Sequence, residues 1–560
     1  MPIETPQDTT VDLLVIGGGT GMAAVLAGHE AGLKTLLVEK TDKLGGSTAL
    51  SGGAFWVPGN AVLAEAGAAD TTERIRNYLN AVVDGSAPAE RSEAYVNHGP
   101  AAVDMLRRTT PLDLMWSKGY SDYHPEAPGG SPAGRTCESK PFDLSILGEN
   151  RELLRGSGLN PPVPMPITGV DYRLMNLMRK LPFKAFPLIF RRVLKGLIGK
   201  VLFKKEYTAG GQALAGGLLA GVLNTNAPIW INTGLKELIT EDGRVTGAIV
   251  EHQGREITVK ATKGVVLAAG GFDHNVEWRR KYQTETFQPS WALGNPGNTG
   301  ESIEIANNTG ADLGGMENVW WFPAVAPVGN GKATVMLAER SLPGSFIVDS
   351  SGNRFVNESC DYMTYGQVIL QREKDGNPVG KTFIVFDQEY RDSYVFATQV
   401  FPKQPLPQKW YDEGIAFKGR TPAELARAAG LPVDAVEATF RNFNVMAANG
   451  LDEDFHRGES AYDRYYGDPT VTPNPNLRPL STGPFYAVEI VLGDLGTCGG
   501  VVADDRARAL RPDGSVIEGL YAIGNNAANA FGRTYPGAGA TIGQGVVYGY
   551  IAARDAAGVL

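Results

Sequence analysis

The chain has 560 residues, more than one hydrophobic core usually supports, which favours two domains or one domain with a large insertion. With 43% hydrophobic residues, 20% charged residues and 70 glycines, its composition is that of a globular protein with many tight turns and excludes a disordered or fibrous chain. The net charge of −9 argues against nucleic acid as a partner.

Three cysteines, Cys137, Cys360 and Cys498, stand far apart and in no C-x-x-C spacing. We therefore expect neither a disulfide framework nor a metal site, which fits a reducing cytoplasm. The N-terminal residues 1–12 are polar and acidic, and no apolar run of about 18 residues occurs in the chain. We expect no secretory signal and no membrane-spanning helix.

A strand, a glycine-rich turn, a helix and a second strand open the chain. The apolar run "VDLLVI" at 11–16 stops at "GGGTGMAAVLAGHEAG", where apolar residues recur at helical spacing, and "LKTLLVEK" restores a strand. Gly17, Gly19 and Gly21 would let the turn approach a pyrophosphate, whose charge would lie at the helix N-terminus. Glu39 ends the second strand about 20 residues on, where a carboxylate can hold ribose hydroxyls.

This glycine pattern alone is a weak signal, because Met22 stands where the G-x-G-x-x-G fingerprint has its last glycine. A glycine-rich turn in an ordinary α/β protein is the plainer interpretation. Three further segments favour a nucleotide-binding domain built from both ends of the chain: "DKLGGSTALSGG" at 42–53, "GVVLAAGGFDHN" at 264–275 and "IEGLYAIGNN" at 517–526.

The segment 173–205 carries ten basic residues and no acidic ones, interleaved with large apolar side chains. Such a basic amphipathic segment is typical of helices that lie on an anionic membrane surface, here the inner face of the cell membrane. In the alternatives, the apolar residues pack on the rest of the protein or on a second subunit, and the charges face water. Pro182 and Pro187 are predicted to split the stretch into short pieces, which argues against crossing a membrane.

The pattern becomes mixed beyond "GGFDHN" at 270–275. "LPGSFIVDSSGNRFVN" predicts a hairpin around Ser350 to Gly352, "KTFIVFD" a strand, and "TPAELARAAGLPVDAVEATFRNFN" two capped helices. The segment "PTVTPNPNLRP" predicts a loop. We place one domain at 319–495, inserted into another formed by 1–318 and 496–560.

The glycine-rich segments, in this order, resemble the flavoprotein group that includes fumarate reductase and succinate dehydrogenase. The resemblance implies an α/β fold, with a two-dinucleotide-fold (Rossmann-like) FAD-binding domain and an inserted α+β catalytic cap domain. It also implies a set of FAD-binding residues in these segments. They are Gly17, Gly19, Gly21, Met22, Glu39, Lys40, Gly45, Gly46, Ser47, Ser51, Gly52, Gly53, Ala269, Gly270, Gly271, Gly524, Asn525, Ala540 and Ile542.

The chain departs from the dicarboxylate enzymes of that group. Where they grip the substrate with a histidine before "GG" and an arginine in the C-terminal glycine motif, this chain has "DLGTCGG" and "RTYPGAG". A dicarboxylate substrate is therefore not expected. The stretch "GGSTALSGG" offers no histidine for a covalent flavin bond, so we expect FAD to bind non-covalently.

Five other segments are similar to the bacterial 3-ketosteroid dehydrogenases, especially those that introduce a double bond between carbons 1 and 2 of the steroid A ring. They are "SDYHPE", "RFVNESCDY", "DEDFHRGESAYDRYYGD", "GPFYAVEIVLGDLGT" and "RTYPGAG". The resemblance implies catalytic roles for Tyr123, Tyr362, Tyr535 and the backbone amide of Gly539. It implies a 3-ketosteroid substrate such as androst-4-ene-3,17-dione and leaves the electron acceptor open, with a quinone as one candidate.

The same resemblance implies proton abstraction from carbon 2 and hydride transfer from carbon 1 to N5 of FAD. Tyr535 and the Gly539 amide would donate hydrogen bonds to the ketone oxygen as enolate charge develops. Tyr362 would be the base, and since a free phenol titrates near pH ~10, we expect a lowered pKa, which hydrogen bonding by Tyr123 could supply. The alternatives are a 3-ketosteroid 4,5-dehydrogenase acting on 5α-steroids, another fumarate-reductase-like flavoprotein, and a flavin-bearing protein without turnover.

Overall fold

An eight-stranded sheet joins the two ends of the chain in a computed structural model that describes residues 5–158 and 164–560. The first four residues of the acidic N-terminal segment lie outside the described residues. The strand order is β20-β21-β11-β1-β2-β8, with β10 on β11 and β9 on β10, and the pairs from β21 to β8 are parallel. The strands are β1 (Thr9–Ile16), β2 (Thr35–Val38), β8 (Ile229–Trp230), β9 (Thr233–Glu241), β10 (Arg244–His252), β11 (Arg255–Leu267), β20 (Arg508–Leu510) and β21 (Val516–Ala522).

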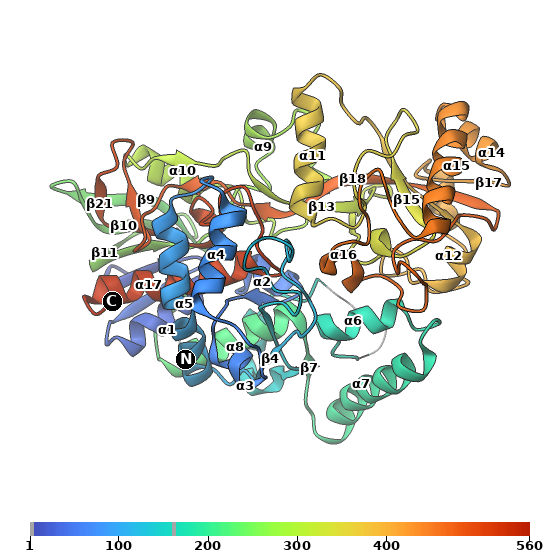
Figure 1. Cartoon of the computed structure of the whole chain (residues 1–560). Helices are drawn as coiled ribbons and strands as arrows, with labels where there is room; N and C mark the ends of the chain where they lie inside the picture. The colour runs from blue at the N-terminus through green and yellow to red at the C-terminus, as the bar shows by residue number, and fades with distance from the viewer. Residues whose placement is uncertain (1–4, 159–163) are drawn as a thin grey trace.

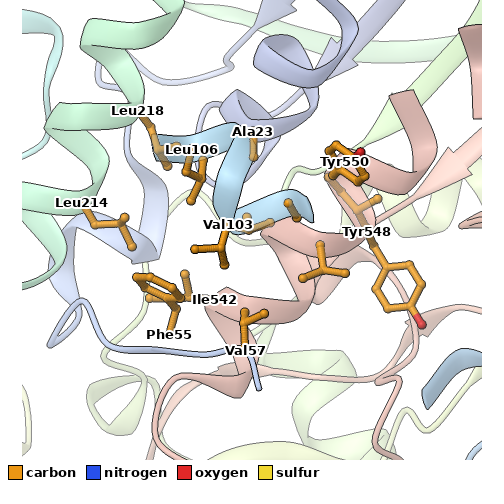
Figure 2. Packing of buried hydrophobic residues seen from close by; sticks show 14 of the residues in the cluster. Ala23, Phe55, Val57, Val103, Leu106, Leu214, Leu218, Ile542, Tyr548 and Tyr550 are labelled. Carbon is orange, nitrogen blue, oxygen red and sulfur yellow. The ribbon is translucent and has the colours of Figure 1, made fainter. Parts of the chain in front are cut away.

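Helices from both ends of the chain pack on this sheet. Parallel strands are buried on both faces, which explains why all of β2 is buried and why three of its residues, Leu36, Leu37 and Val38, are apolar. Figure 2 shows side chains of α1 (Gly21–Glu30), α5 (Ala89–Thr109), α8 (Gly210–Asn224) and α17 (Ala540–Ala557) meeting in one cluster. The predicted strand, turn, helix and strand at the start of the chain are confirmed, and they share a core with the C-terminal helix.

A second, antiparallel sheet forms the other lobe in Figure 1. Its order is β14-β13-β18-β16-β15, with β17 also on β18. The strands are β13 (Val319–Val325), β14 (Thr334–Val335), β15 (Ser345–Val348), β16 (Thr382–Asp387), β17 (Ala416–Gly419) and β18 (Phe485–Thr497). The helices of this lobe are α11 (Tyr362–Lys374), α12 (Gln388–Ser393), α13 (Gln408–Asp412), α14 (Pro422–Ala429), α15 (Val433–Asn449) and α16 (Ala461–Tyr465).

Strand β16, helices α14 and α15 and the loop at 469–479 confirm four predicted elements of this lobe. This sheet draws on residues 319–497, and the domain division before 319 and after 495 stays a prediction.

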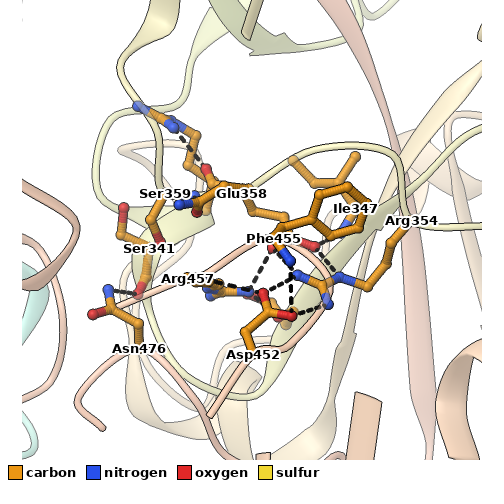
Figure 3. Close-up of polar contacts among 12 residues, drawn as sticks. Ser341, Ile347, Arg354, Glu358, Ser359, Asp452, Phe455, Arg457 and Asn476 are labelled. Atoms are coloured by element: carbon orange, nitrogen blue, oxygen red, sulfur yellow. Dashed lines mark hydrogen bonds and ion pairs between the residues drawn. The ribbon is translucent and has the colours of Figure 1, made fainter. Parts of the chain in front are cut away.

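The hairpin predicted around Ser350 to Gly352 is wrong in its second arm. The turn exists, because the Gly352 amide donates to the Asp349 carbonyl at 2.9 Å, but β15 pairs with β16 instead of with the residues that follow the turn. Those residues are held by side chains: Arg354 pairs with Glu358 and with Asp452, each at 2.7 Å (Figure 3). Ion pairs of Arg354 thus hold this segment in place of the strand pairing that a hairpin would have formed.

The prolines of the basic segment do not split it, contrary to the prediction. Residues Pro182–Leu202 form one helix, α7, which follows the shorter α6 (Gly169–Asn176). Pro182 occupies the first helical position, where an N–H has no helical partner. Pro187 lies only one turn further on, so its missing N–H removes a single hydrogen bond near the helix end.

Short elements complete the structure. The strands are β3 (Phe55–Trp56), β4 (Leu114–Trp116), β5 (Thr136–Ser139), β6 (Phe142–Asp143), β7 (Tyr207–Thr208), β12 (Leu313–Gly314) and β19 (Gly500–Val501). The α-helices are α2 (Gly46–Leu50), α3 (Ala61–Glu65), α4 (Thr72–Val83), α9 (Val276–Tyr282) and α10 (Glu301–Asn308). The 3-10 helices are η1 (Leu144–Leu153), η2 (Pro289–Trp291), η3 (Glu339–Ser341) and η4 (Gly524–Asn526).

Candidate active site

A cavity of about 580 Å³ lies where the parallel strands of the first sheet end, and residues of the second lobe close it. The segments that follow β1, β2, β11 and β21 all contribute to its lining. Because the carboxyl ends of parallel strands meet at one edge of a sheet, segments more than 500 residues apart come together here.

The glycine turn after β1 forms one part of the wall. Gly17 has a φ of +115°, and a Cβ atom there would lie 2.3 Å from the Ala268 carbonyl oxygen, so only glycine fits. Gly17 and Gly19 line the cavity, and α1 begins two residues after Gly19. The positive end of the α1 dipole therefore lies beside the backbone of the turn that lines the cavity, as an anion-binding site requires.

Glu39 follows β2 and is buried in the cavity wall. Its carboxylate accepts hydrogen bonds from the Gly18 amide and from the amide and hydroxyl of Thr41, each at 2.9 Å. Two carboxylate oxygens offer about four acceptor sites, so one remains for a ribose hydroxyl. Lys40 also lines the cavity, but its ammonium group is bonded to Glu301 at 2.6 Å.

Most of the other residues predicted to bind the cofactor line the same cavity: Gly46, Ser47, Ser51, Gly52, Gly53, Ala269, Gly270, Gly524, Asn525 and Ile542. A few lie behind the wall: Gly21, Met22, Gly45, Gly271 and Ala540. Their contribution is to packing, as Gly271 shows, because a Cβ atom there would lie 2.1 Å from the Thr497 hydroxyl. A direct contact with the cofactor stays a prediction for both groups of residues. The cavity fits FAD, because amides and a helix N-terminus suit its pyrophosphate and Glu39 suits a ribose.

Tyrosines from three distant segments gather at this cavity. Tyr362 is the first residue of α11, and its hydroxyl is hydrogen-bonded to that of Tyr123 and lies 3.3 Å from that of Tyr120. The ring of Tyr535 meets that of Tyr123 edge to face at 5.0 Å and lies 6.0 Å from that of Tyr362. Tyr362 and Tyr535 line the cavity, whereas Tyr123 lies behind them. The structure therefore brings the three predicted tyrosines together.

The two predicted donors are also adjacent, since the Gly539 amide lies 3.2 Å from the Tyr535 hydroxyl, to which it donates. Gly539 is the N-cap of α17, and its φ of +86° and the Ala54 carbonyl, 2.0 Å from an added Cβ, require glycine. Both donors line the cavity at a helix N-terminus, where developing negative charge is stabilised.

The pKa of Tyr362 differs from the value expected from the sequence. Burial raises the pKa of Tyr362 well above its ordinary value, and the neighbouring phenols of Tyr120, Tyr462 and Tyr535 raise it further. Burial also raises the pKa of Tyr123 and of Tyr535. The expectation of a lowered pKa for Tyr362 is therefore wrong for this structure, because desolvation of the phenolate dominates, and the contribution assigned to Tyr123 stays a prediction.

Sequence reasoning missed further residues of the site. Tyr120, Tyr466, Tyr172 and Phe322 line the cavity, as do Asn295 and Asn298, whose backbone and side-chain amides donate to the Ser47 hydroxyl at 2.9 and 3.0 Å. Tyr466 lies within "DEDFHRGESAYDRYYGD" and Tyr120 directly precedes "SDYHPE", two of the segments quoted above, and several tyrosines stand close together in each region. That clustering was the available signal.

The family model described as FAD binding domain matches residues 12–542. The chain is 43% identical to the 3-oxosteroid 1-dehydrogenase of Mycolicibacterium smegmatis, over 98% of this chain and 97% of that protein.

Two solved structures are similar to this one. The crystal structure of 3-ketosteroid delta1-dehydrogenase from Sterolibacterium denitrificans, in complex with 1,4-androstadiene-3,17-dione, matches with a TM-score of 0.92 and 33% identity over 98% of this chain and 100% of that one. The 3-ketosteroid-delta4-(5alpha)-dehydrogenase of Rhodococcus jostii matches with a TM-score of 0.67 and 21% identity over 99% and 98% of the chains, a likeness of fold alone. The chain therefore belongs to the FAD-binding-domain family and, within it, to the 3-oxosteroid 1-dehydrogenases.

Proposed function

We propose that this protein catalyses the FAD-dependent 1,2-dehydrogenation of 3-ketosteroids. The observation that carries the proposal is the meeting of Tyr123, Tyr362, Tyr535 and the Gly539 amide at the cavity that also holds the glycine turn and Glu39. The two relatives named for this activity, at 43% and 33% identity, support it.

Each polar group at the tyrosine end of the cavity has a task in this reaction. The ketone at carbon 3 makes the hydrogens on carbon 2 weakly acidic. Two donors on its oxygen, Tyr535 and the Gly539 amide, would stabilise enolate charge once the ketone replaces the Tyr535 hydroxyl as the acceptor of that amide. Tyr362 takes the proton from carbon 2, and Tyr123 fixes its hydroxyl by hydrogen bonding. Bound FAD supplies the acceptor for the hydride from carbon 1.

The turn at Gly17 and Gly19, Glu39 and the N-terminus of α1 would hold FAD, and no histidine stands in the segment 42–53 beside them. We therefore expect the flavin to be bound without a covalent bond. Acid precipitation of the purified yellow protein should release all the flavin into the supernatant. Colour that stays with the pellet would contradict this prediction.

The position of the new double bond separates the proposal from its rival, the 4,5-dehydrogenation of 5α-steroids. Purified enzyme is incubated with androst-4-ene-3,17-dione and an artificial electron acceptor, because this substrate already carries the double bond between carbons 4 and 5. We expect the 1,4-diene as the product. Turnover of 5α-androstane-3,17-dione to the 4-ene, without any 1,4-diene from androst-4-ene-3,17-dione, would favour the rival.

We further propose that α7 rests on an anionic membrane surface from which the enzyme draws its substrate. The helix packs on the protein through small buried residues, Ala185, Gly196 and Gly199. Its opposite face is turned to solvent and carries large apolar side chains that recur every three or four residues, so they lie on one side of the helix. The residues of this face are Phe183, Phe186, Phe190, Leu194, Leu197 and Val201.

The charges around this face suit a bilayer with anionic lipids. Lys184, Arg191 and Lys200 are exposed and form no ion pair with the described residues, so their ammonium and guanidinium groups remain available. Not every basic residue of the segment is free, since Arg192 pairs with Asp171 at 2.7 Å. None of the helices among the described residues has the length and hydropathy to cross a bilayer, so the contact we propose is peripheral.

Flotation with anionic liposomes tests this contact. Wild-type protein should float at low salt, and a variant with Phe183, Phe190 and Val201 changed to Ser should not, because the apolar side chains supply most of the insertion energy. The control is Val445→Ser, which removes another exposed apolar side chain, from α15 in the other lobe. Wild-type protein that stays at the bottom of the gradient would contradict the proposal.

A further inference from the structure

Arg340 is a buried cation beside the proposed base. It lies in η3, is 1% exposed, and places its guanidinium carbon 5.7 Å from the centre of the Tyr362 ring. One of its nitrogens donates to the Glu358 carbonyl at 2.6 Å and to the Cys360 carbonyl. No carboxylate among the described residues pairs with it, and its Nε has no hydrogen-bond partner.

Two other arginines of the same lobe have carboxylate counter-ions. Arg354 pairs with Glu358 and Asp452, and Arg457 pairs with Glu358 at 3.3 Å (Figure 3). A buried guanidinium without a counter-ion is costly, and two carbonyl oxygens offset that cost only in part. An anion formed beside Arg340 during turnover would supply the missing partner.

We propose that Arg340 is a positioning residue for the reaction, which stabilises the tyrosinate form of Tyr362. The inference rests on the proposed function, in which Tyr362 accepts the proton from carbon 2. The negative charge of a tyrosinate spreads into its ring, and the guanidinium faces that ring. An opposite charge within about 4–6 Å lowers the pKa of an acid by about one to three units. The favourable interaction between Arg340 and the tyrosinate thus counteracts the burial that raises the pKa of Tyr362.

The other groups around Tyr362 do not replace this charge. The neighbouring phenols raise the pKa of Tyr362. The two residues that precede it, Cys360 and Asp361, carry a thiol and a carboxyl and supply no positive charge. Asp361 is the opposing charge, but it caps α11 by accepting from the amides of Met363 and Thr364, and it lies 4.0 Å from His124. The titratable and charged groups around Tyr362 are Tyr120, Tyr123, Tyr462, Tyr466, Tyr535, Cys360, Asp361 and Arg340.

The pH dependence of the holoenzyme tests the proposal. Tyr362 must be ionised to accept a proton, so kcat/KM falls as pH drops below its pKa. In Arg340→Gln we expect this acid limb to move to higher pH by about one to three units. The control is Arg391→Gln, which removes another buried guanidinium bonded to carbonyl oxygens, those of Gln404, Tyr394, Val400 and Phe401. It should leave the limb in place.

Arg340→Lys separates charge from structure, because it keeps the cation and loses the forked donor. Its acid limb should stay near that of wild type, and a limb displaced as far as that of Arg340→Gln would overturn the proposal. So would an unmoved limb with uniformly lower rates in Arg340→Gln, because a merely structural role gives that result.

A titration without substrate keeps the inference separate from the proposed function. Tyrosinate absorbance in the near ultraviolet is measured against pH for wild type and Tyr362→Phe, and their difference gives the ionisation of Tyr362. The same difference is measured between Arg340→Gln and the double variant that also carries Tyr362→Phe. We expect it at higher pH without Arg340. Equal pKa values in the two backgrounds overturn the inference, whereas a shift in a protein whose Tyr362→Phe variant turns over normally contradicts only the assigned base.

Discussion

Tyr362→Phe should reduce flavin in a single anaerobic turnover at least about 1000-fold more slowly than wild type. A positioned general base contributes about 10²–10⁴ in rate, and without it no enolate develops to drive hydride departure from carbon 1. FAD content should not change, because the phenyl ring keeps its stacking on Phe322 at 4.3 Å. The measurement is stopped-flow absorbance of the flavin after mixing with a 3-ketosteroid.

Tyr365→Phe is the matched control for this variant. It removes a hydroxyl from a tyrosine that is also buried, three residues further along α11, without touching the groups that line the cavity. It should reduce flavin at close to the wild-type rate. If flavin in Tyr362→Phe is reduced at the wild-type rate, Tyr362 is not the base.

Tyr535→Phe should lower kcat/KM by a factor of about 100 or more while the protein stays yellow. Loss of one donor to a developing oxyanion costs about 3 kcal/mol, and the Gly539 amide remains to hold the ketone oxygen. The ring contacts with Trp320 at 4.7 Å and with Tyr123 do not need the hydroxyl. Steady-state kinetics with an artificial acceptor and flavin absorbance measure both effects.

Tyr548→Phe provides the comparison, since it removes a buried hydroxyl that donates to the Arg91 carbonyl at 2.6 Å, further along α17. We expect a lower midpoint of thermal unfolding and unchanged turnover. A Tyr535→Phe variant with bound FAD and near-normal turnover would remove Tyr535 from the reaction.

The first sheet and its glycine turn were predictable because each signal lies in one continuous stretch of sequence. The run to Ile16, the glycines from Gly17 and the helical spacing after Gly21 are local properties. The hairpin near Ser350 failed because its stabilising contact is not local: Arg354 reaches Asp452, 98 residues away, and no pattern around the turn reveals that. The prediction that prolines divide the basic segment failed because a proline near the start of a helix costs little stability.

The candidate site was predictable only in part. Glu39 and the glycines follow from a pattern with a physical reason, whereas Tyr123 and Tyr362, 239 residues apart, were assigned through a family resemblance. Arg340 carries no sequence signal, because a cation over an aromatic ring is a property of tertiary structure. The raised pKa of Tyr362 was missed for the same reason, since burial cannot be read from its neighbours along the chain.

Anaerobic mixing of the purified holoenzyme with androst-4-ene-3,17-dione tests the central claim most directly. The account predicts that the flavin absorbance bleaches and that one molecule of androsta-1,4-diene-3,17-dione forms for each flavin reduced, without any added acceptor. A flavin that stays oxidised in the presence of saturating steroid, in protein that dithionite reduces normally, would contradict it.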